Sequence, residues 1–238
     1  MKTLLLLISF TTVAAAAAEK KPQTVYEEGV KLMETGRLSQ AQAKFEKAVK
    51  LDQNFDPARF QLAVSYHLSG KDERALKELL KVKTDPETMK RVPLLRGELL
   101  LKTKNWKEAE TVWQSLPDTN PDLKALKAQG LARALEGEGR NREAADSWTE
   151  YLELQVKPTS DLFQKVAENR IKAGEKDDGL KYCDTTTHLA KHPSYRLLCK
   201  AHVYRAAKEN QLAFDAVKKA FDDDKDNLDA GRLVKEWK

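Results

Sequence analysis

The sequence is poor in several residue types that mark other classes of protein. Aromatic residues make up 7% of the 238 residues, and there are only two cysteines, ten glycines and eight prolines. This composition excludes a collagen-like chain, a disordered low-complexity chain and a multi-span membrane protein. Valine, isoleucine and threonine are too thinly spread to supply several strands. Because alanine, leucine, lysine and glutamate dominate, we expect a soluble, charge-rich helical protein.

The chain also lacks the short motifs of common catalytic sites. It contains no His-Glu-x-x-His, no Gly-x-Ser-x-Gly, no phosphate-binding glycine loop and no Cys-x-x-Cys. We therefore expect no enzymatic activity and no cofactor. The formal net charge is +5, and basic and acidic residues alternate along the chain as they do on solvated helix faces. Nothing in this charge pattern favours a nucleic-acid partner.

A long uncharged run follows Met1–Lys2 and ends in a series of alanines at Ala18. The run is short for a membrane anchor, and Ala16 and Ala18 fit the small-residue pattern of a signal-peptidase site. We expect residues 1–18 to be a cleaved signal peptide, an uncleaved anchor being the alternative. The absence of any Asn-x-Ser/Thr acceptor favours a bacterial envelope. The mature chain would then be periplasmic or secreted, with no membrane insertion after cleavage.

Small residues recur along the chain every 34 or 35 residues, which indicates an internal repeat. The first series is Gly29, Ala63, Gly97, Ala132, Ala167 and Ala201. A second series lies twelve residues further on: Ala41, Ala75, Ala109, Ala144, Gly179 and Ala213. Between them a turn residue recurs: Gly36, Gly70, Gly139 and Gly174, with Lys104 and Lys208 in the same place. Four residues after the second series comes a bulkier side chain: Phe45, Leu79, Trp113, Trp148, Cys183 and Val217.

This spacing predicts a series of helical hairpins. In the first repeat, Val25, Gly29 and Leu32 share one face of a helix, and Ala41 and Phe45 share one face of the next. The small residue lets the two helices approach closely, the large residue fills the remaining space, and the glycine ends the first helix in a left-handed cap. A single hairpin would leave its other apolar face in water, so neighbouring hairpins must stack.

These residues resemble the tetratricopeptide repeat, a helix–turn–helix unit of 34 residues with an aromatic residue in its second helix. The clearest stretches are Gln61–Tyr66 with Gly70, Ala75 and Leu79, and Gly29 with Gly36, Ala41, Phe45 and Ala48. The resemblance implies an all-α, right-handed superhelical solenoid of about six repeats, five being the alternative. The implied repeats are 22–55, 56–89, 90–124, 125–159, 160–193 and 194–227, followed by a capping helix at 228–238.

Repeats five and six depart most from the family pattern. Arg170 stands where a large residue of the first helix is expected. Gly179 replaces the alanine of the second helix, and Cys183 replaces its aromatic residue. We therefore expect looser packing in these two repeats.

The resemblance also implies a curved groove, lined by the first helix of each repeat, that holds a segment of a partner protein. In repeats one to three the groove positions are mainly apolar: Tyr26, Val30, Met33, Phe60, Val64, His67, Leu94 and Leu101. In repeats four to six they are mainly polar: Gln129, Arg133, Glu136, Gln164, Glu168, Ile171, Leu198, His202 and Arg205. We expect the apolar half to hold a segment of another envelope protein and the charged half to set its orientation. Alternatively, the apolar residues pack between neighbouring first helices.

The two cysteines fall in consecutive predicted helices. Cys183 and Cys199 each lie eight residues from Lys191, so an antiparallel hairpin places them at the same height. In an oxidising compartment we expect a disulfide here, two buried thiols being the alternative.

The same region contains the residues that most resemble metal ligands. His188 and His192 are four residues apart, and Cys199 and His202 are three apart. His192 precedes Pro193 at a helix end, and Cys183 points away from His188, so these side chains do not converge. We expect no metal site.

Together these features predict a non-catalytic adaptor or scaffold of the bacterial envelope. A structural or self-assembling solenoid without a separate partner is the alternative, and an apolar outer face on the last helix would favour it. The sequence leaves the formation of a homo-oligomer open.

Overall fold

The computed structural model describes residues 21–155, 159–185 and 193–238. The predicted signal peptide lies outside these residues, as do His188 and His192. The described residues form thirteen helices and no strand. The helices are α1 (Pro22–Glu34), α2 (Leu38–Leu51), α3 (Asp56–Leu68), α4 (Asp72–Leu79), α5 (Pro86–Lys102), α6 (Trp106–Gln114), α7 (Pro121–Glu138), α8 (Asn141–Glu153), α9 (Ser160–Lys172), α10 (Lys176–Thr185), α12 (Pro193–Ala206), α13 (Asn210–Asp223) and α14 (Leu228–Glu236).

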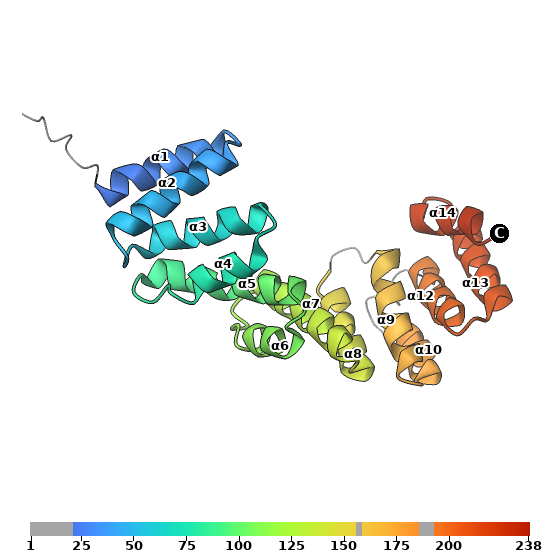
Figure 1. The fold of residues 1–238 in the computed structure, drawn as a ribbon. Coiled ribbons are helices and arrows are strands. Elements are labelled where there is room, and N and C mark those ends of the chain that lie inside the picture. Colours follow the sequence, from blue (N-terminus) through green and yellow to red (C-terminus); the bar gives the residue numbers. More distant parts are fainter. Residues whose placement is uncertain (1–20, 156–158, 186–192) are drawn as a thin grey trace, which may run out of the picture.

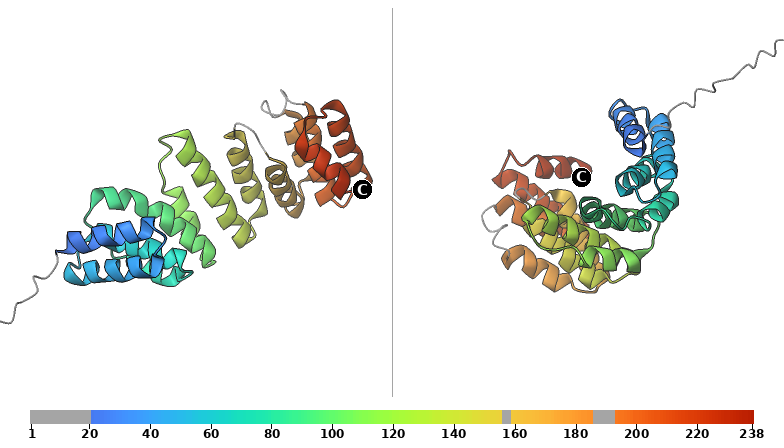
Figure 2. Two further views of the ribbon diagram at one scale, coloured as in Figure 1. Left: turned by 90° about the horizontal axis from the view of Figure 1, so that it is seen from above. Right: turned by 90° about the vertical axis from the view of Figure 1, so that its left-hand side faces the viewer.

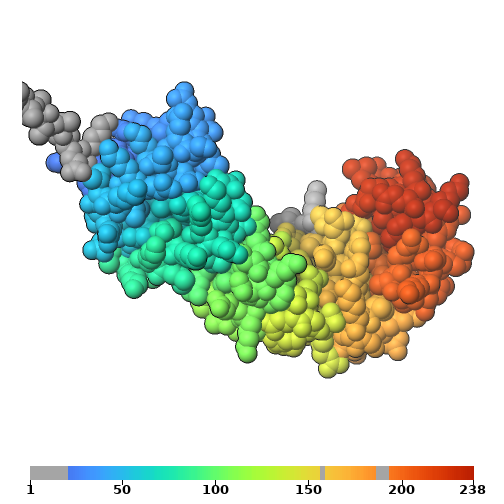
Figure 3. Space-filling model, viewed as in Figure 1, coloured from blue at the N-terminus to red at the C-terminus, as the bar shows by residue number. Residues whose placement is uncertain are grey.

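The helices follow one another as six pairs and a final single helix (Figure 1). We call the first helix of each pair the A helix (α1, α3, α5, α7, α9 and α12) and the second the B helix. The pairs lie along an arc, with α1 at one end and α14 at the other (Figure 2). In the space-filling view the molecule is hollowed between its N-terminal and C-terminal ends (Figure 3). The prediction of an all-α solenoid with six repeats and a C-terminal helix is confirmed.

The turn between the two helices of every pair contains a residue in the left-handed conformation. The six residues are Gly36, Gly70, Lys104, Gly139, Gly174 and Lys208, with φ values from 60° to 77°. The next amide donates a hydrogen bond to the carbonyl five residues back, as from Arg37 N to Leu32 O over 2.8 Å. This is the glycine-type helix end that the repeat pattern predicts, and the two lysines adopt it at a steric cost.

Small residues of the A helices face large residues of the B helices. A Cβ atom added at Gly29 would lie 2.6 Å from Phe45 Cε1. The Trp113 ring lies between α5 and α7, because a Cβ at Gly97 would come within 2.7 Å of it and one at Gly130 within 2.1 Å. Glycine is therefore required at these positions for the close approach of helix to ring.

Two A helices begin earlier than the repeat boundaries at 90 and 125 predict. Helix α5 begins at Pro86, where the Asp85 carboxylate accepts a hydrogen bond from Thr88 N over 2.7 Å. Helix α7 begins at Pro121, where the Asn120 side chain accepts one from Leu123 N over 2.8 Å. A capping side chain followed by proline is a strong helix start, so these two helices gain a turn at their N-termini.

Asp56 joins the second repeat to the third. Its side chain is 2% exposed, and Oδ2 accepts hydrogen bonds from Lys83 N, Thr84 N, Asp85 N and the Thr84 hydroxyl at 2.5 to 3.0 Å. Burial alone would raise the pKa of Asp56, but these hydrogen bonds from Asp85, Thr84 and Lys83 outweigh burial and lower it. The ionised carboxylate thus fixes the connection between α4 and α5.

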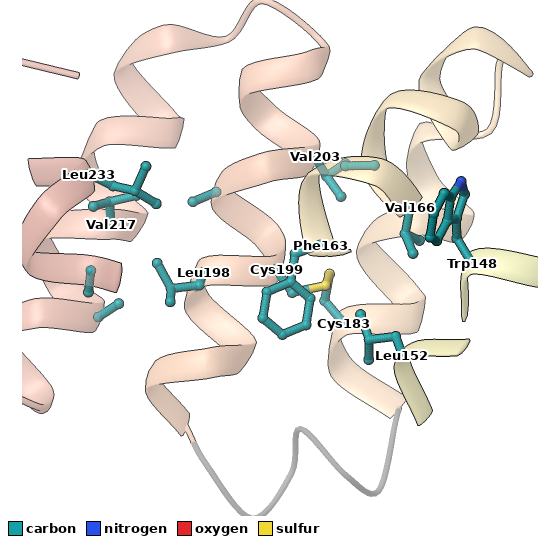
Figure 4. Packing of buried hydrophobic residues seen from close by; sticks show 14 of the residues in the cluster. Trp148, Leu152, Phe163, Val166, Cys183, Leu198, Cys199, Val203, Val217 and Leu233 are labelled. Atoms are coloured by element: carbon teal, nitrogen blue, oxygen red, sulfur yellow. A yellow bond between two sulfur atoms is a disulfide. The ribbon is translucent and has the colours of Figure 1, made fainter. Parts of the chain in front are cut away.

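The expectation of looser packing is wrong for repeat six, where α12 and α13 pack closely, whereas in repeat five the described parts of α9 and α10 make fewer contacts with each other than any other A and B helix of one pair. The largest cluster of buried apolar residues runs from α7 to α14 and includes Cys183 and Cys199, which form a disulfide (Figure 4). Arg170 is accommodated by ion pairs with Glu175 at 2.8 Å and Asp146 at 2.5 Å. A polar residue at this A-helix position is therefore neutralised across the interface instead of leaving a void.

Candidate functional site

The eight apolar-half groove residues lie on α1, α3 and α5, and all of them are partly or fully buried. Phe60 and Leu101 are each 4% exposed, whereas the other six retain some accessible surface. The Tyr26 ring packs against Phe45 at 5.9 Å and Phe55 at 5.4 Å between centroids. These residues thus contribute to the contacts between repeats and also form part of the A-helix surface.

The structure divides these eight residues among several packing clusters. One cluster of buried apolar residues is flanked by Tyr26, Val30 and Met33. A second includes Phe60 and is flanked by Val64. A third includes Leu101 and is flanked by Leu94. The His67 Nδ1 atom lies 2.6 Å from Asp72 Oδ1 at the start of α4. The Phe60 ring is covered by the Arg91 guanidinium, 4.5 Å from the ring centroid.

Six of the groove residues in the polar half line two cavities on the A-helix side. The first cavity, of about 450 Å³, is lined by Leu101, Trp106, Arg133, Glu136, Gly137, Trp148 and Lys165. The second, of about 200 Å³, is lined by Gln164, Glu168, His202, Arg205, Ala206 and Trp237. Leu101 brings one residue of the apolar half to the first cavity.

In the first cavity Glu136 is held in place by hydrogen bonds. Its Oε1 atom accepts from Trp148 Nε1 at 2.9 Å and from Asn169 Nδ2 at 2.7 Å. The Lys165 ammonium lies 3.8 Å from the same oxygen and 5.9 Å from the centroid of the Trp148 ring. One turn earlier on α7, Arg133 pairs with both carboxylate oxygens of Glu98 at 2.9 and 3.0 Å.

In the second cavity His202 is 4% exposed and lies between two other elements. Its Nε2 atom is 2.7 Å from the Ser160 hydroxyl, and its ring meets that of Trp237 edge to face at 5.3 Å. Burial lowers the pKa of His202 to about 4, so the ring is neutral at neutral pH. The Arg205 guanidinium lies 5.2 Å from the centroid of the Trp237 ring.

Sequence reasoning identified Trp148 as a bulky residue of its repeat but did not place Trp106 and Trp237 at these cavities. Trp106 begins α6, and its ring covers Gly137, where a Cβ would lie 2.2 Å from it. Trp237 follows α14, the helix that was predicted only to close the solenoid. The sequence does contain a signal for Trp106, because it stands two residues after Lys104, which occupies the turn position of its repeat. Trp237 lies beyond the last full repeat, and its neighbours depend on the path of α14.

A third cavity, of about 600 Å³, lies on α14 and the end of α13. Its lining residues are Phe221, Lys225, Asn227, Leu228, Gly231, Arg232, Val234, Lys235 and Glu236. Leu228 is 85% exposed. The outer face of the last helix is therefore partly apolar, which is the feature expected of a self-assembling solenoid.

The cysteine and metal predictions concern the same helices. Cys183 on α10 and Cys199 on α12 are joined by a disulfide with a Cα–Cα distance of 5.7 Å. In the described parts of the chain, no group of three or more His, Cys, Asp and Glu side chains is arranged to hold a metal ion. Nor is any helix of these parts both long enough and apolar enough to cross a bilayer.

Comparison with solved structures identifies the architecture. Residues 41 to the end of MamA from Desulfovibrio magneticus are 15% identical, with a TM-score of 0.60 over 72% of this chain and 96% of that one. The fold is that of the tetratricopeptide repeat. PilF from Pseudomonas aeruginosa is 17% identical, with a TM-score of 0.54 over 90% of this chain and 97% of that one. A tetratricopeptide repeat protein from Parabacteroides merdae is 15% identical, with a TM-score of 0.54 over 93% and 86%.

No protein-family model matches the sequence, and no curated protein matches it either. At these low identities the structural similarity shows the fold alone.

Proposed function

We propose that this protein is a non-catalytic interaction scaffold of the bacterial envelope, which holds a segment of another envelope protein along its A helices. The observation that carries the proposal is the A-helix surface itself. It joins half-buried apolar residues on α1, α3 and α5 to two open cavities between α5 and α14. A surface that extends over several repeats and combines apolar with polar positions suits a partner segment better than a small molecule.

Two features support an envelope location. The N-terminal apolar run with its alanine-rich end has the form of a signal peptide. The disulfide between Cys183 and Cys199 is suited to an oxidising compartment. Fusion of residues 1–30 to a reporter that is active only after export tests the location, and a reporter that stays inside the cell would contradict it.

We expect the apolar half of the A-helix surface, on α1, α3 and α5, to make most of the contacts with the partner segment. Tyr26 and Phe60 are poor positions for a test, because their rings are packed inside the repeats. Val30 and Val64 keep accessible surface on the A helices, and Val30→Asp with Val64→Asp places two charges there. The matched control is Leu80→Asp with Leu212→Asp, since these leucines are 59% and 50% exposed outside the A helices.

The experiment is capture of partners from an envelope extract, identification by mass spectrometry and titration of the purified partner. Circular dichroism first establishes that both variants fold like the parent. We expect the Val30/Val64 variant to lose the identified partner and the Leu80/Leu212 variant to keep it. Equal affinity in both variants would overturn the apolar-half site, and an absence of any specific partner would overturn the scaffold.

The third cavity favours one second candidate, a solenoid that assembles through its C-terminal end. Leu228 exposes an apolar side chain beside Phe221 and Val234 on the outer face of α14. Sedimentation of the protein with and without Leu228→Glu tests this: assembly of the parent that the substitution abolishes would support it, and a monomer at all concentrations would exclude it.

A further inference from the structure

We infer that the C-terminal part of the A-helix surface, around α9, recognises acidic side chains of an extended partner segment. This inference rests on the proposed scaffold function and deepens it by naming the chemistry of the partner. The site consists of the two cavities described above, which we call the α9 site.

Helix α9 separates the two cavities and contributes to both. Lys165 lines the first cavity, while Gln164 and Glu168 line the second. The remaining walls come from α5, α6, α7 and α8 on one side and from α12 and Trp237 on the other. A segment laid across α9 would therefore meet both cavities in turn.

Each cavity contains a tryptophan ring with a cation over it. Lys165 Nζ lies 5.9 Å from the centroid of Trp148, and the Arg205 guanidinium lies 5.2 Å from that of Trp237. A ring beneath a cation restrains it on one side and leaves its other N–H donors free. Each cavity thus presents a cation beside an aromatic ring at the surface.

These two cations are only weakly neutralised by the protein. In the described chain no carboxylate forms an ion pair with Arg205, whose one hydrogen bond is to the neutral Asn210 side chain at 3.0 Å. Lys165 is 47% exposed, and its nearest carboxylate oxygen, on Glu136, is 3.8 Å away. By contrast, Arg133 in the first cavity is satisfied by both oxygens of Glu98.

The carboxylates that line the site reduce this preference, but neither of them forms an ion pair with Arg205. Glu136 is held in place by hydrogen bonds from Trp148 and Asn169 and keeps its charge. Glu168 accepts a hydrogen bond from Gln164 Nε2 at 2.7 Å. Because Glu168 lines the same cavity as Arg205 without pairing with it, Glu168 weakens the attraction of an acidic side chain there.

The size of the second cavity favours a side chain of a peptide as its occupant. A volume of about 200 Å³ is below the roughly 300 Å³ at which small-molecule pockets begin. His202 adds no charge to the second cavity at neutral pH. The chemistry that fits is therefore an aspartate or glutamate side chain paired with Arg205 and another near Lys165, with apolar neighbours against the rings.

The test is selection from a random 12-residue peptide display library on the purified protein. We expect the selected peptides to contain more aspartate and glutamate than the unselected library. Arg205→Gln and Lys165→Gln should each weaken binding of the best synthetic peptide about tenfold at low salt, the equivalent of one charge-assisted hydrogen bond. Glu168→Gln should strengthen it. Arg196→Gln on α12 and Lys172→Gln on α9 are the controls, because both cations are exposed and line neither cavity.

The outcomes separate this inference from the proposed function. Peptides selected without acidic enrichment, or equal effects of the four cation variants, would overturn the α9 site and leave the scaffold standing. Failure to select any peptide would overturn both. Acidic peptides that depend on Arg205 and Lys165 but not on Arg196 and Lys172 would support both.

Discussion

The two halves of the solenoid bury their apolar residues in different ways. From α7 to α14 a single continuous cluster joins repeats four to six and the final helix. From α1 to α7 the described buried residues fall into four smaller clusters. In the N-terminal half polar contacts also link neighbouring repeats, such as those of Asp56 with the α4–α5 connection and the hydrogen bond from Arg59 Nη2 to the Gln53 carbonyl after α2 at 2.5 Å.

The difference shows that a regular repeat pattern does not ensure an apolar core that continues from each repeat to the next. Both halves contain a small and a bulkier residue at the repeat spacing, yet among the described residues the disulfide and the continuous apolar core lie in the C-terminal half. A repeat protein is approximately a sum of local interfaces, so its halves can differ in stability. We expect the C-terminal half to be the more stable one under oxidising conditions.

The largest effect is expected from Trp113→Ala. The Trp113 ring is 4% exposed and fills the space beside Gly97 and Gly130, so its removal leaves a cavity where the two halves meet. We expect a loss of about 3 to 5 kcal/mol and separate unfolding of the halves in urea, followed by circular dichroism. Trp113→Phe is the milder comparison, because the indole N–H has no hydrogen-bond partner in the structure. A single transition with less than about 1 kcal/mol lost would contradict this arrangement.

Removal of the disulfide should weaken the C-terminal half. Cys183 and Cys199 are 16 residues apart, and closing a loop of this length contributes about 3 kcal/mol. The double variant Cys183→Ala and Cys199→Ala should lose about that amount and become insensitive to reductant. If native-state hydrogen exchange speeds up in α1 to α4 as much as in α10 and α12, the two halves are not independent.

Mild acid should distinguish the halves through His202. The pKa of His202 is lowered to about 4 by burial, while Asp229 and Glu168 act to raise it and Arg232 to lower it. Between its ordinary value of 6.5 and pH 4 the unfolded chain binds a proton that the folded chain does not, so stability falls as pH falls. Roughly 2 to 3 kcal/mol should be lost between pH 7 and pH 4.5.

Urea titrations at the two pH values, with His202→Gln as the variant that lacks this group, measure the effect. Asp56 in the N-terminal half has a lowered pKa, so its stabilising contribution is lost only as pH falls below its ordinary value of 3.8. An equal loss of stability in the His202→Gln variant would show that other groups cause the acid sensitivity.

The smallest effect is expected at the turns. Lys104 has φ near 60°, where glycine is unstrained, so Lys104→Gly should stabilise the protein by about 1 kcal/mol. Gly70→Ala, at φ near 71°, should destabilise it by a similar amount. Thermal melts of the two variants would disagree with this reasoning if both shifted in the same direction.

The fold could be predicted from the sequence because the small, large and turn residues of each repeat determine its helical hairpin locally. The spacing alone predicts the same turn position for Gly36, Lys104 and Lys208, and all three adopt the left-handed conformation. The starts of α5 and α7 differ most, because the repeat spacing does not take Asp85–Pro86 and Asn120–Pro121 into account as helix starts.

The candidate site could be predicted from the sequence only in part. The spacing placed Arg133, Glu136, His202 and Arg205 on the A helices, and the structure places them in cavities. It did not reveal that Phe60 and Leu101 are nearly inaccessible, because burial depends on how tightly neighbouring repeats pack. Trp237 was missed for the same reason, since its place beside His202 depends on three elements far apart in sequence.

The central claim is that the A-helix surface binds a partner segment. Hydrogen–deuterium exchange of the protein with and without its identified partner, read peptide by peptide, tests it most directly. We expect slower exchange in α1, α3, α9 and α12 and little change in the B helices α2, α4 and α13. Protection confined to the B helices or to α14 would contradict it.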